Sequence, residues 1–271
     1  MRPPPEDRVY AVADGMELLA RIYRPAGDGP FPAVLEVHGG AWVNGDRLNN
    51  VAIAEALAEA GILVVSVDFR MPPAAMYPAP VADVNRAIRW LKAHAEELGS
   101  RPERVGALGT SSGGHMLLLN VLRPHDARYA ALRVEGGVAH DATVAFAIVC
   151  WPVADPLTRY RAVRERGNER LAEAHRRFWP DEAAMAEGSP QGILERGEPV
   201  RTPPLLIMQG TKDDNLTPDM ASRFAQAYAM AGGEATLRLF PGMPHAFIAP
   251  DPASPGAQRA LGMMIDFIRQ P

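Results

Sequence analysis

The amino-acid sequence predicts an α/β fold with a mainly parallel sheet. Two observations carry this prediction: short apolar or β-branched runs alternate with longer stretches of helical periodicity, and the runs end at loops rich in glycine, proline or aspartate. Such alternation requires crossover helices, which pack on both faces of the sheet. A length of 271 residues is usual for one unit of this kind, so we expect residues 1–271 to form a single domain.

The expected elements follow in order along the chain. Two strands, 8–12 and 18–23, are joined through Asp14-Gly15, a dipeptide that favours a tight hairpin. Further strands are expected at 33–37, 62–67, 104–108, 145–150, 205–209 and 236–240, and helices at 50–60, 81–98, 114–120, 218–231 and 257–269. The hairpin and the later units together predict a sheet of about eight strands.

The segment from Asp155 to Arg201 interrupts this alternation. Connections within parallel α/β units are commonly about 2–6 residues long, whereas this segment is long, charged and helix-prone. We expect residues 155–201 to form a small helical cap at the carboxyl ends of the strands, where open α/β sheets place their sites. A helical decoration without substrate contact is the alternative.

Composition and charge favour a globular protein that acts on small or neutral molecules. Hydrophobic residues make up 47% of the chain, charged residues 22%, and the net charge is -4. The two signs are mixed along the sequence, which argues against nucleic-acid and membrane partners. Cys150 is the single cysteine and lies in an apolar run, so we assign it no redox or metal role.

Targeting and cofactor signals are absent from the sequence. The start of the chain has no apolar signal stretch, and no run reaches the roughly 18 apolar residues of a membrane span. The cytoplasm is therefore the expected compartment. We expect neither a metal nor an organic cofactor, and a homodimer is the candidate assembly.

The strongest local signal is the segment Gly109-Thr110-Ser111-Ser112-Gly113, which matches Gly-x-Ser-x-Gly. It lies between a predicted strand and a predicted helix, where such an elbow lifts its serine hydroxyl above the edge of the sheet. Glycines on either side leave room for the cramped turn. The pattern predicts that Ser111 is a nucleophile.

A serine nucleophile needs a general base and an acid that orients it. A loop after the last strand carries His245, and a loop after the preceding strand carries Asp213 and Asp214. The order serine, acid, histidine is the one expected for this elbow, and all three loops follow strands that we expect to be parallel. We predict Asp213 and His245 as partners of Ser111, with Asp214 and then Asp155 as alternatives for the acid.

The oxyanion of the reaction needs preorganised N–H donors. The segment His38-Gly39-Gly40-Ala41-Trp42 follows a strand, and its small residues permit backbone N–H groups to converge. We predict the N–H groups of Gly40, Ala41 and Ser112 as donors, whereas His38 orders the loop by hydrogen bonding. A tight turn without a ligand is the alternative.

Several aromatic residues lie near the predicted catalytic loops or in the insertion. We expect them to wall the substrate pocket, with core packing as the alternative for each: Trp42, Trp151, Phe178, Trp179 and Phe247.

Five motifs together resemble the hormone-sensitive-lipase-like esterases of the α/β-hydrolase superfamily. They span most of the chain in the family's order: His38 to Asp46, Asp68 to Arg70, Tyr77 to Asp83, Gly109 to Gly114 and Gly242 to Phe247. The resemblance implies an α/β-hydrolase fold and esterase activity. Two features depart from that family: Ala41 replaces a usual third glycine, and the N-terminal segment is shorter.

Other relatives of the superfamily share parts of this pattern. The short start and the His-Gly-Gly-x-Trp form are similar to kynurenine formamidases and small bacterial acyl esterases. The loop 210–215 is similar to that of prolyl-oligopeptidase-type peptidases, where the first of two aspartates is the acid, which supports Asp213.

These observations predict a carboxylic-ester hydrolase that acts on short-chain acyl or aryl esters through a Ser-His-Asp triad and an acyl-enzyme. The small cap favours short acyl chains over triglycerides. Two alternatives remain: an arylformamidase or other amidase with the same triad, and a ligand-binding relative without turnover.

Overall fold

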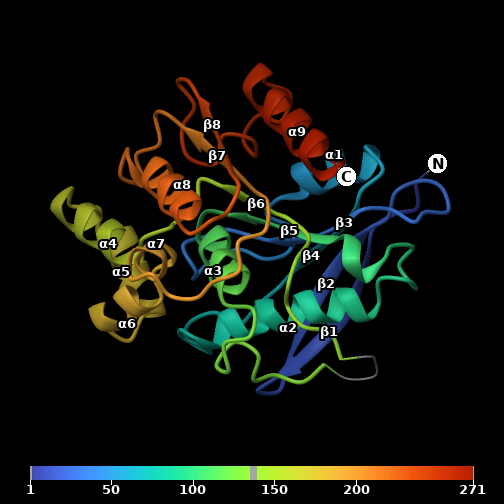
Figure 1. The fold of residues 1–271 in the computed structure, drawn as a ribbon, viewed down its shortest axis with the longest axis horizontal. Helices are drawn as coiled ribbons and strands as arrows, with labels where there is room; N and C mark the ends of the chain where they lie inside the picture. The colour runs from blue at the N-terminus through green and yellow to red at the C-terminus, as the bar shows by residue number, and fades with distance from the viewer. Residues whose placement is uncertain (1, 135–138, 271) are drawn as a thin grey trace.

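The computed structural model describes residues 2–134 and 139–270. Their strands form one eight-stranded sheet in the order β1-β2-β4-β3-β5-β6-β7-β8 (Figure 1). Only β2 pairs in an antiparallel manner, with β1 on one side and β4 on the other, whereas the remaining pairs are parallel. The sequence-based prediction of an α/β fold with a mainly parallel sheet is confirmed.

The strands match the predicted ones closely. Their bounds are β1 Glu6–Ala13, β2 Met16–Tyr23, β3 Ala33–Val37, β4 Leu63–Val67, β5 Val105–Thr110, β6 Ala147–Cys150, β7 Leu205–Gly210 and β8 Ala235–Phe240. Asp14 and Gly15 join β1 to β2 with φ angles of 51° and 76°. Both lie in the left-handed region that a two-residue hairpin turn requires, which explains the Asp-Gly dipeptide.

Helices cover both faces of the sheet. α1 (Val51–Glu59) and α9 (Pro255–Ile268) contact each other on one face, and α2 (Ala79–Ala93), α3 (Ser111–Leu122) and α8 (Met220–Met230) lie on the other (Figure 1). A short 3-10 turn, Pro102–Arg104, precedes β5. The helix predicted at 81–98 begins two residues earlier, at Ala79, and ends five residues earlier, at Ala93, where His94 is the C-cap.

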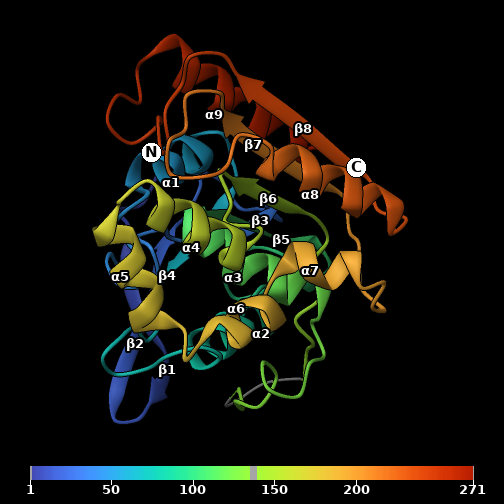
Figure 2. The same ribbon diagram turned by 90° about the vertical axis from the view of Figure 1, so that its left-hand side faces the viewer.

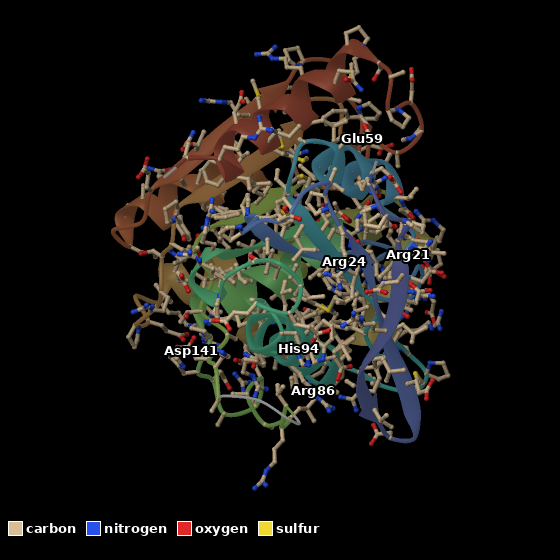
Figure 3. The ribbon with its side chains drawn as sticks, turned by 90° about the vertical axis from the view of Figure 1, so that its right-hand side faces the viewer. Arg21, Arg24, Glu59, Arg86, His94 and Asp141 are labelled. Carbon is tan, nitrogen blue, oxygen red and sulfur yellow. The ribbon has the colours of Figure 1, made fainter. Side chains whose placement is uncertain are left out.

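Strands β3 to β7 are buried along their whole length, which fits their near-continuous apolar sequence. Figure 3 shows the face of the molecule that carries the hairpin, with His94, the residue that follows α2, to the left of the hairpin. His94 stacks on Trp90 at 4.5 Å and its Nδ1–H donates to the Trp90 carbonyl oxygen at 2.8 Å. Its role is local packing.

The insertion after β6 folds as a run of short helices. They are α4 Pro156–Glu165, α5 Glu169–Phe178, α6 Glu182–Glu187 and α7 Pro190–Glu195. Figure 2 shows them together in front of α3, on the side of the molecule that the carboxyl ends of the strands face. No helix in the described ranges is both long and apolar enough to cross a membrane.

Candidate active site

The turn between β5 and α3 places Ser111 at the carboxyl edge of the sheet. Ser111 has a φ angle of 51°, a strained conformation for a residue with a side chain. A β-carbon at Gly113 would collide with the carbonyl oxygens of Val37 and His38, so the helix packs closely on β3 only with glycine there. Gly113, the second glycine of the elbow, therefore allows α3 to pack closely against the end of β3.

The side chains of Ser111, His245 and Asp213 form one hydrogen-bonded series. His245 Nε2 lies 2.9 Å from Ser111 Oγ, and His245 Nδ1 lies 2.7 Å from Asp213 Oδ2. The serine hydroxyl donates to Nε2, while Nδ1–H donates to the carboxylate. Both distances are within hydrogen-bond reach for proton transfer and for orientation of the imidazole. The sequence-predicted order of these three residues thus corresponds to direct contact.

Asp213 is held as an anion in a buried place. Its side chain is only 3% exposed. Burial raises the pKa of Asp213, but hydrogen bonds from His245, from Gln209 Nε2 at 2.8 Å and from the Asn215 N–H at 2.9 Å outweigh it, so that the pKa is lowered overall. The carboxylate therefore stays ionised beside the imidazole at neutral pH.

The alternative acids lie elsewhere. Asp155 caps helix α4, because its carboxylate accepts hydrogen bonds from the N–H and the hydroxyl of Thr158 at 3.1 and 2.7 Å. Asp214 contributes its backbone carbonyl oxygen to Arg166 at 2.8 Å, and His245 pairs with Asp213 instead. The geometry favours Asp213 among the three candidates.

The loop after β3 contributes Gly39, Gly40 and Ala41 to the cavity that Ser111 also lines. Gly40 and Ala41 adopt φ angles of 112° and 53°, and a β-carbon at Gly40 would collide with the Asn44 carbonyl. The Trp42 N–H donates to Ser112 Oγ at 3.0 Å, which ties the loop to the first turn of α3. Within the described ranges, neither the Gly40 nor the Ala41 N–H donates to a protein acceptor.

The Ser112 N–H belongs to the first turn of α3, where N–H groups have no intrahelical acceptor. The Ser112 N–H therefore has no acceptor within its own helix, like the other N–H groups of that first turn.

His38 is a scaffold of this loop. It is fully buried, stacks on Phe69 at 4.3 Å, and its Nδ1–H donates to the Gly39 carbonyl oxygen at 2.6 Å. Burial lowers the pKa of His38. The neutral imidazole orders the loop, as expected from the sequence.

A cavity of about 350 Å³ opens above Ser111 and His245. Its other lining residues come from the loop after β3, the start of α1, the end of β5, the cap and the loops after β6 to β8: Gly39, Gly40, Ala41, Asn44, Asn49, Asn50, Ile53, Thr110, Trp151, Arg159, Arg170, Leu171, Asn215, Ala246, Ile248 and Ala249. A larger hollow of about 450 Å³ lies at the amino ends of β6 to β8, away from the serine.

The predicted aromatic wall is wrong for four of its five residues. Trp151 lines the cavity, whereas the other four are buried and do not: Trp42, Phe178, Trp179 and Phe247. Trp42 stacks on Phe178 at 5.1 Å and meets Trp179 edge-on at 5.9 Å. Trp42, Phe178 and Trp179 thus pack the loop after β3 against the cap, and their burial removes large apolar surfaces from water.

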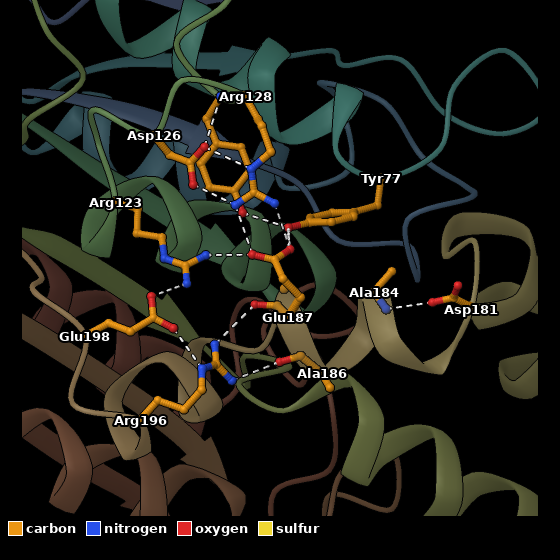
Figure 4. A network of polar contacts seen from close by, with 12 residues as sticks. Tyr77, Arg123, Asp126, Arg128, Asp181, Ala184, Ala186, Glu187, Arg196 and Glu198 are labelled. Atoms are coloured by element: carbon orange, nitrogen blue, oxygen red, sulfur yellow. Dashed lines mark hydrogen bonds and ion pairs between the residues drawn. The ribbon is translucent and has the colours of Figure 1, made fainter.

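Polar contacts attach the cap to the body of the fold. Glu187 at the end of α6 accepts hydrogen bonds from Tyr77 at 2.5 Å and from Arg123 and Arg128, each at 2.9 Å (Figure 4). These partners keep the pKa of Glu187 down at about 2, although burial acts in the opposite direction. The other end of the Arg123 guanidinium pairs with Glu198 beyond α7.

Sequence reasoning missed four residues that shape the site. Gln209 holds the acid, Arg159 and Arg170 line the cavity, and His115 accepts a hydrogen bond of 3.2 Å from the Trp42 indole. Gln209 could have been identified from the sequence, because it lies at the end of a buried strand, just before the loop that carries Asp213. The arginines carry no such signal.

The fold and this arrangement define an α/β-hydrolase. The BD-FAE family model matches residues 21–228, and the chain belongs to that family. The esterase LipC of Mycobacterium tuberculosis is 28% identical over 84% of this chain, and ethyl acetate hydrolase of Pseudomonas putida is 28% identical over 97% of it. The chain spans 56% of the length of LipC and 82% of ethyl acetate hydrolase.

Solved structures give the same result. The esterase Est2 of Thermogutta terrifontis with propionate bound superposes with a TM-score of 0.78 at 28% identity, covering 98% of this chain and 94% of that one. The same esterase phosphorylated by paraoxon gives 0.77 at 26% identity, over the same shares of both chains. The resemblance to esterases of the α/β-hydrolase superfamily is confirmed.

Proposed function

We propose that the protein is a serine carboxylic-ester hydrolase that cleaves short-chain acyl or aryl esters. The observation that carries this proposal is the series Asp213, His245 and Ser111, hydrogen-bonded in that order and ending in the cavity. The esterase names of the relatives support the reaction class.

In this reaction Ser111 Oγ attacks the ester carbonyl carbon while His245 Nε2 takes the hydroxyl proton. The N–H groups of Gly40, Ala41 and Ser112 stabilise the resulting oxyanion, each worth on the order of 10² to 10³ in rate. His245 then protonates the leaving alkoxide, and the acyl group stays on Ser111. A water deprotonated by His245 attacks this acyl-enzyme and releases the carboxylic acid.

Asp213 acts by orientation and charge. Its carboxylate fixes the imidazole with Nδ1 protonated and Nε2 facing the serine, and it stabilises the imidazolium of each transition state. The hydrogen bonds that keep Asp213 ionised therefore support the proton transfers of His245.

The cavity favours small substrates. A volume of about 350 Å³ is at the low end of ligand pockets. The related esterase Est2 has been solved with propionate and with butyrate bound, which supports short acyl groups for this chain.

Hydrolysis of 4-nitrophenyl acetate and butyrate by the wild type and by Ser111→Ala tests the proposal. We expect the substitution to lower kcat by about 10⁴-fold or more, whereas Ser222→Ala, an exposed serine on α8, leaves it unchanged. Wild-type rates in Ser111→Ala contradict the mechanism. N-formylkynurenine is assayed in parallel, and a large preference for it assigns the site to arylformamide hydrolysis instead.

A further inference from the structure

Arg159 is a buried cation beside the catalytic residues. It lies on α4, is 1% exposed, and lines the cavity that holds Ser111 and His245. Its Nε–H donates to the Asn215 carbonyl oxygen at 3.2 Å, but Nη1 is buried without any hydrogen-bond partner. In the described part of the chain no carboxylate lies within 4.0 Å of its guanidinium.

A buried charge without a counter-ion is unfavourable, so proteins normally pair it. Burial, with a smaller effect from Arg170, lowers the pKa of Arg159 to about 10 against the attraction of Asp213. The guanidinium is nevertheless positive at neutral pH. The protein therefore holds a cation in this cavity without supplying the anion that would neutralise it.

Neighbouring groups strengthen the positive character of the cavity. Arg170 at the start of α5 is exposed and lines the same cavity, and no aspartate or glutamate is among the lining residues. The carboxylate of Asp213, whose charge attracts Arg159, is already engaged by His245 and Gln209. An anion entering from solvent thus meets two arginines and no competing acid.

Packing alone does not account for Arg159. Its guanidinium lies over the Trp42 ring at 5.5 Å, a cation–π contact that uses the face of the group. The donors lie at the edge of the guanidinium plane, where a carboxylate binds in a bidentate manner. The unpartnered Nη1 is the observation that packing leaves unexplained.

We propose that Arg159, assisted by Arg170, binds a carboxylate of the substrate, so that the ester cleaved at Ser111 carries a second, ionised carboxyl group. This inference rests on the proposed esterase function and names its substrate class. Two sources of the carboxylate fit: the acyl half, as in a half-ester of a dicarboxylic acid, or the alcohol half, as in an acylated hydroxy acid.

Two matched pairs of esters test the inference and separate these sources. Monoethyl glutarate is compared with ethyl pentanoate for the acyl half, and 3-acetoxypropanoate with propyl acetate for the alcohol half, each by acid release at constant pH. We expect the charged member of one pair to have a kcat/KM about 10- to 100-fold above its neutral partner, the usual effect of a hydrogen bond to a charged group.

Variants assign the preference to Arg159. Arg159→Met keeps the length of the side chain and removes the charge, so we expect the ratio of kcat/KM for the charged ester to that for its neutral partner to fall to about one, whatever the rate on the neutral ester. Arg170→Gln reduces the preference for the charged ester only partly. Arg164→Gln, an exposed arginine on the same helix that does not line the cavity, keeps it. Competitive inhibition of the wild type by glutarate, at least tenfold stronger than by 1,5-pentanediol, supports the site even where Arg159→Met fails to fold.

The results that would overturn the carboxylate site differ from those that would overturn the esterase function. Hydrolysis of the neutral esters with no preference for either charged ester, or a preference that Arg159→Met retains, overturns the carboxylate site and leaves the esterase function intact. Failure to hydrolyse any of the four esters or the 4-nitrophenyl esters overturns the esterase function itself.

Discussion

The indole Nε1–H of Trp42 donates to Nδ1 of His115 at 3.2 Å, and the Nε2–H of His115 donates to the Gly188 carbonyl oxygen at 2.8 Å. These two hydrogen bonds join the loop after β3, helix α3 and the cap through one buried imidazole. Burial lowers the pKa of His115 to about 4, so the ring is neutral at the pH of the assay. We therefore expect His115, which does not line the cavity, to help hold Gly40 and Ala41 in place through Trp42.

Trp42→Phe tests this dependence. The phenyl ring keeps the stacking on Phe178 but loses the hydrogen bond to His115. We expect kcat to fall at least tenfold with little change in KM, because a displacement of about 1 Å in catalytic geometry is worth on the order of 10² in rate. The matched control is Trp90→Phe, which lies on α2 away from the site. Steady-state kinetics with 4-nitrophenyl butyrate measure kcat and KM of both variants. An equal loss of kcat in the two variants argues against a role for the hydrogen bond between Trp42 and His115.

Asp213→Asn and Asp214→Asn distinguish the adjacent carboxylates. An amide at position 213 no longer accepts the Nδ1–H of His245 in the required tautomer, so we expect kcat to fall by about 10⁴-fold. Asp214 makes no side-chain contact with His245 among the described residues, and its variant retains wild-type kcat. The reverse pattern contradicts the assignment of the acid.

Glu187→Gln weakens the attachment of the cap. The substitution removes the charge that faces Arg123 and Arg128, although the carboxylate is 39% exposed and solvent screens part of its interaction. We expect a loss of about 1 kcal/mol in the free energy of unfolding near neutral pH. Urea titration measures this free energy of unfolding. The control is Glu182→Gln, whose partner Arg161 is exposed, and we expect it to lose less stability.

The same variant has a defined pH dependence. The pKa of Glu187 is below its usual value, so its stabilising effect is full above the unfolded value of 4.5 and disappears as the pH falls toward about 2. The difference in unfolding free energy between wild type and Glu187→Gln narrows over that range. A difference that stays constant down to pH 2.5 contradicts the ion-pair explanation.

His175 makes the fold sensitive to acid. Burial lowers the pKa of His175 to about 3, so between the unfolded value of 6.5 and about 3 only the unfolded chain takes up its proton. Stability therefore falls as the pH drops below 6.5, by up to about 1.4 kcal/mol per pH unit for this group.

His175→Phe removes this proton uptake and keeps a ring against Trp42, which contacts His175 at 5.0 Å. Unfolding free energies from pH 7 to pH 4.5 are expected to decline less steeply in the variant than in the wild type. Parallel slopes contradict the assignment. Arg161→Gln, on the exposed side of α4, is the control with an unchanged slope.

The residues that sequence predicts well are those whose local pattern determines their place. The elbow around Ser111 needs glycines at fixed positions, and the order of Asp213 and His245 follows from the succession of parallel strands, so all three meet at one edge. The Asp14-Gly15 turn is predictable for the same reason, because its left-handed angles select those residues.

The cap is where sequence reasoning fails. Its helices are amphipathic, but periodicity does not say which face meets the cavity, so Arg159 looks like one of many charged residues until the fold buries it. The aromatic residues Phe178 and Trp179 were expected at the substrate and instead pack around Trp42. Both outcomes are set by tertiary packing, which a single segment does not encode.

Covalent labelling of Ser111 tests the central claim most directly. A fluorophosphonate is incubated with the wild type, Ser111→Ala and His245→Ala, and the labelled peptide is identified by mass spectrometry. The account predicts stoichiometric phosphonylation of Ser111 in the wild type, none in Ser111→Ala, and labelling slowed by at least about 10³-fold in His245→Ala. A wild-type protein that remains unlabelled at Ser111, or labels at another serine with loss of hydrolysis, would contradict it.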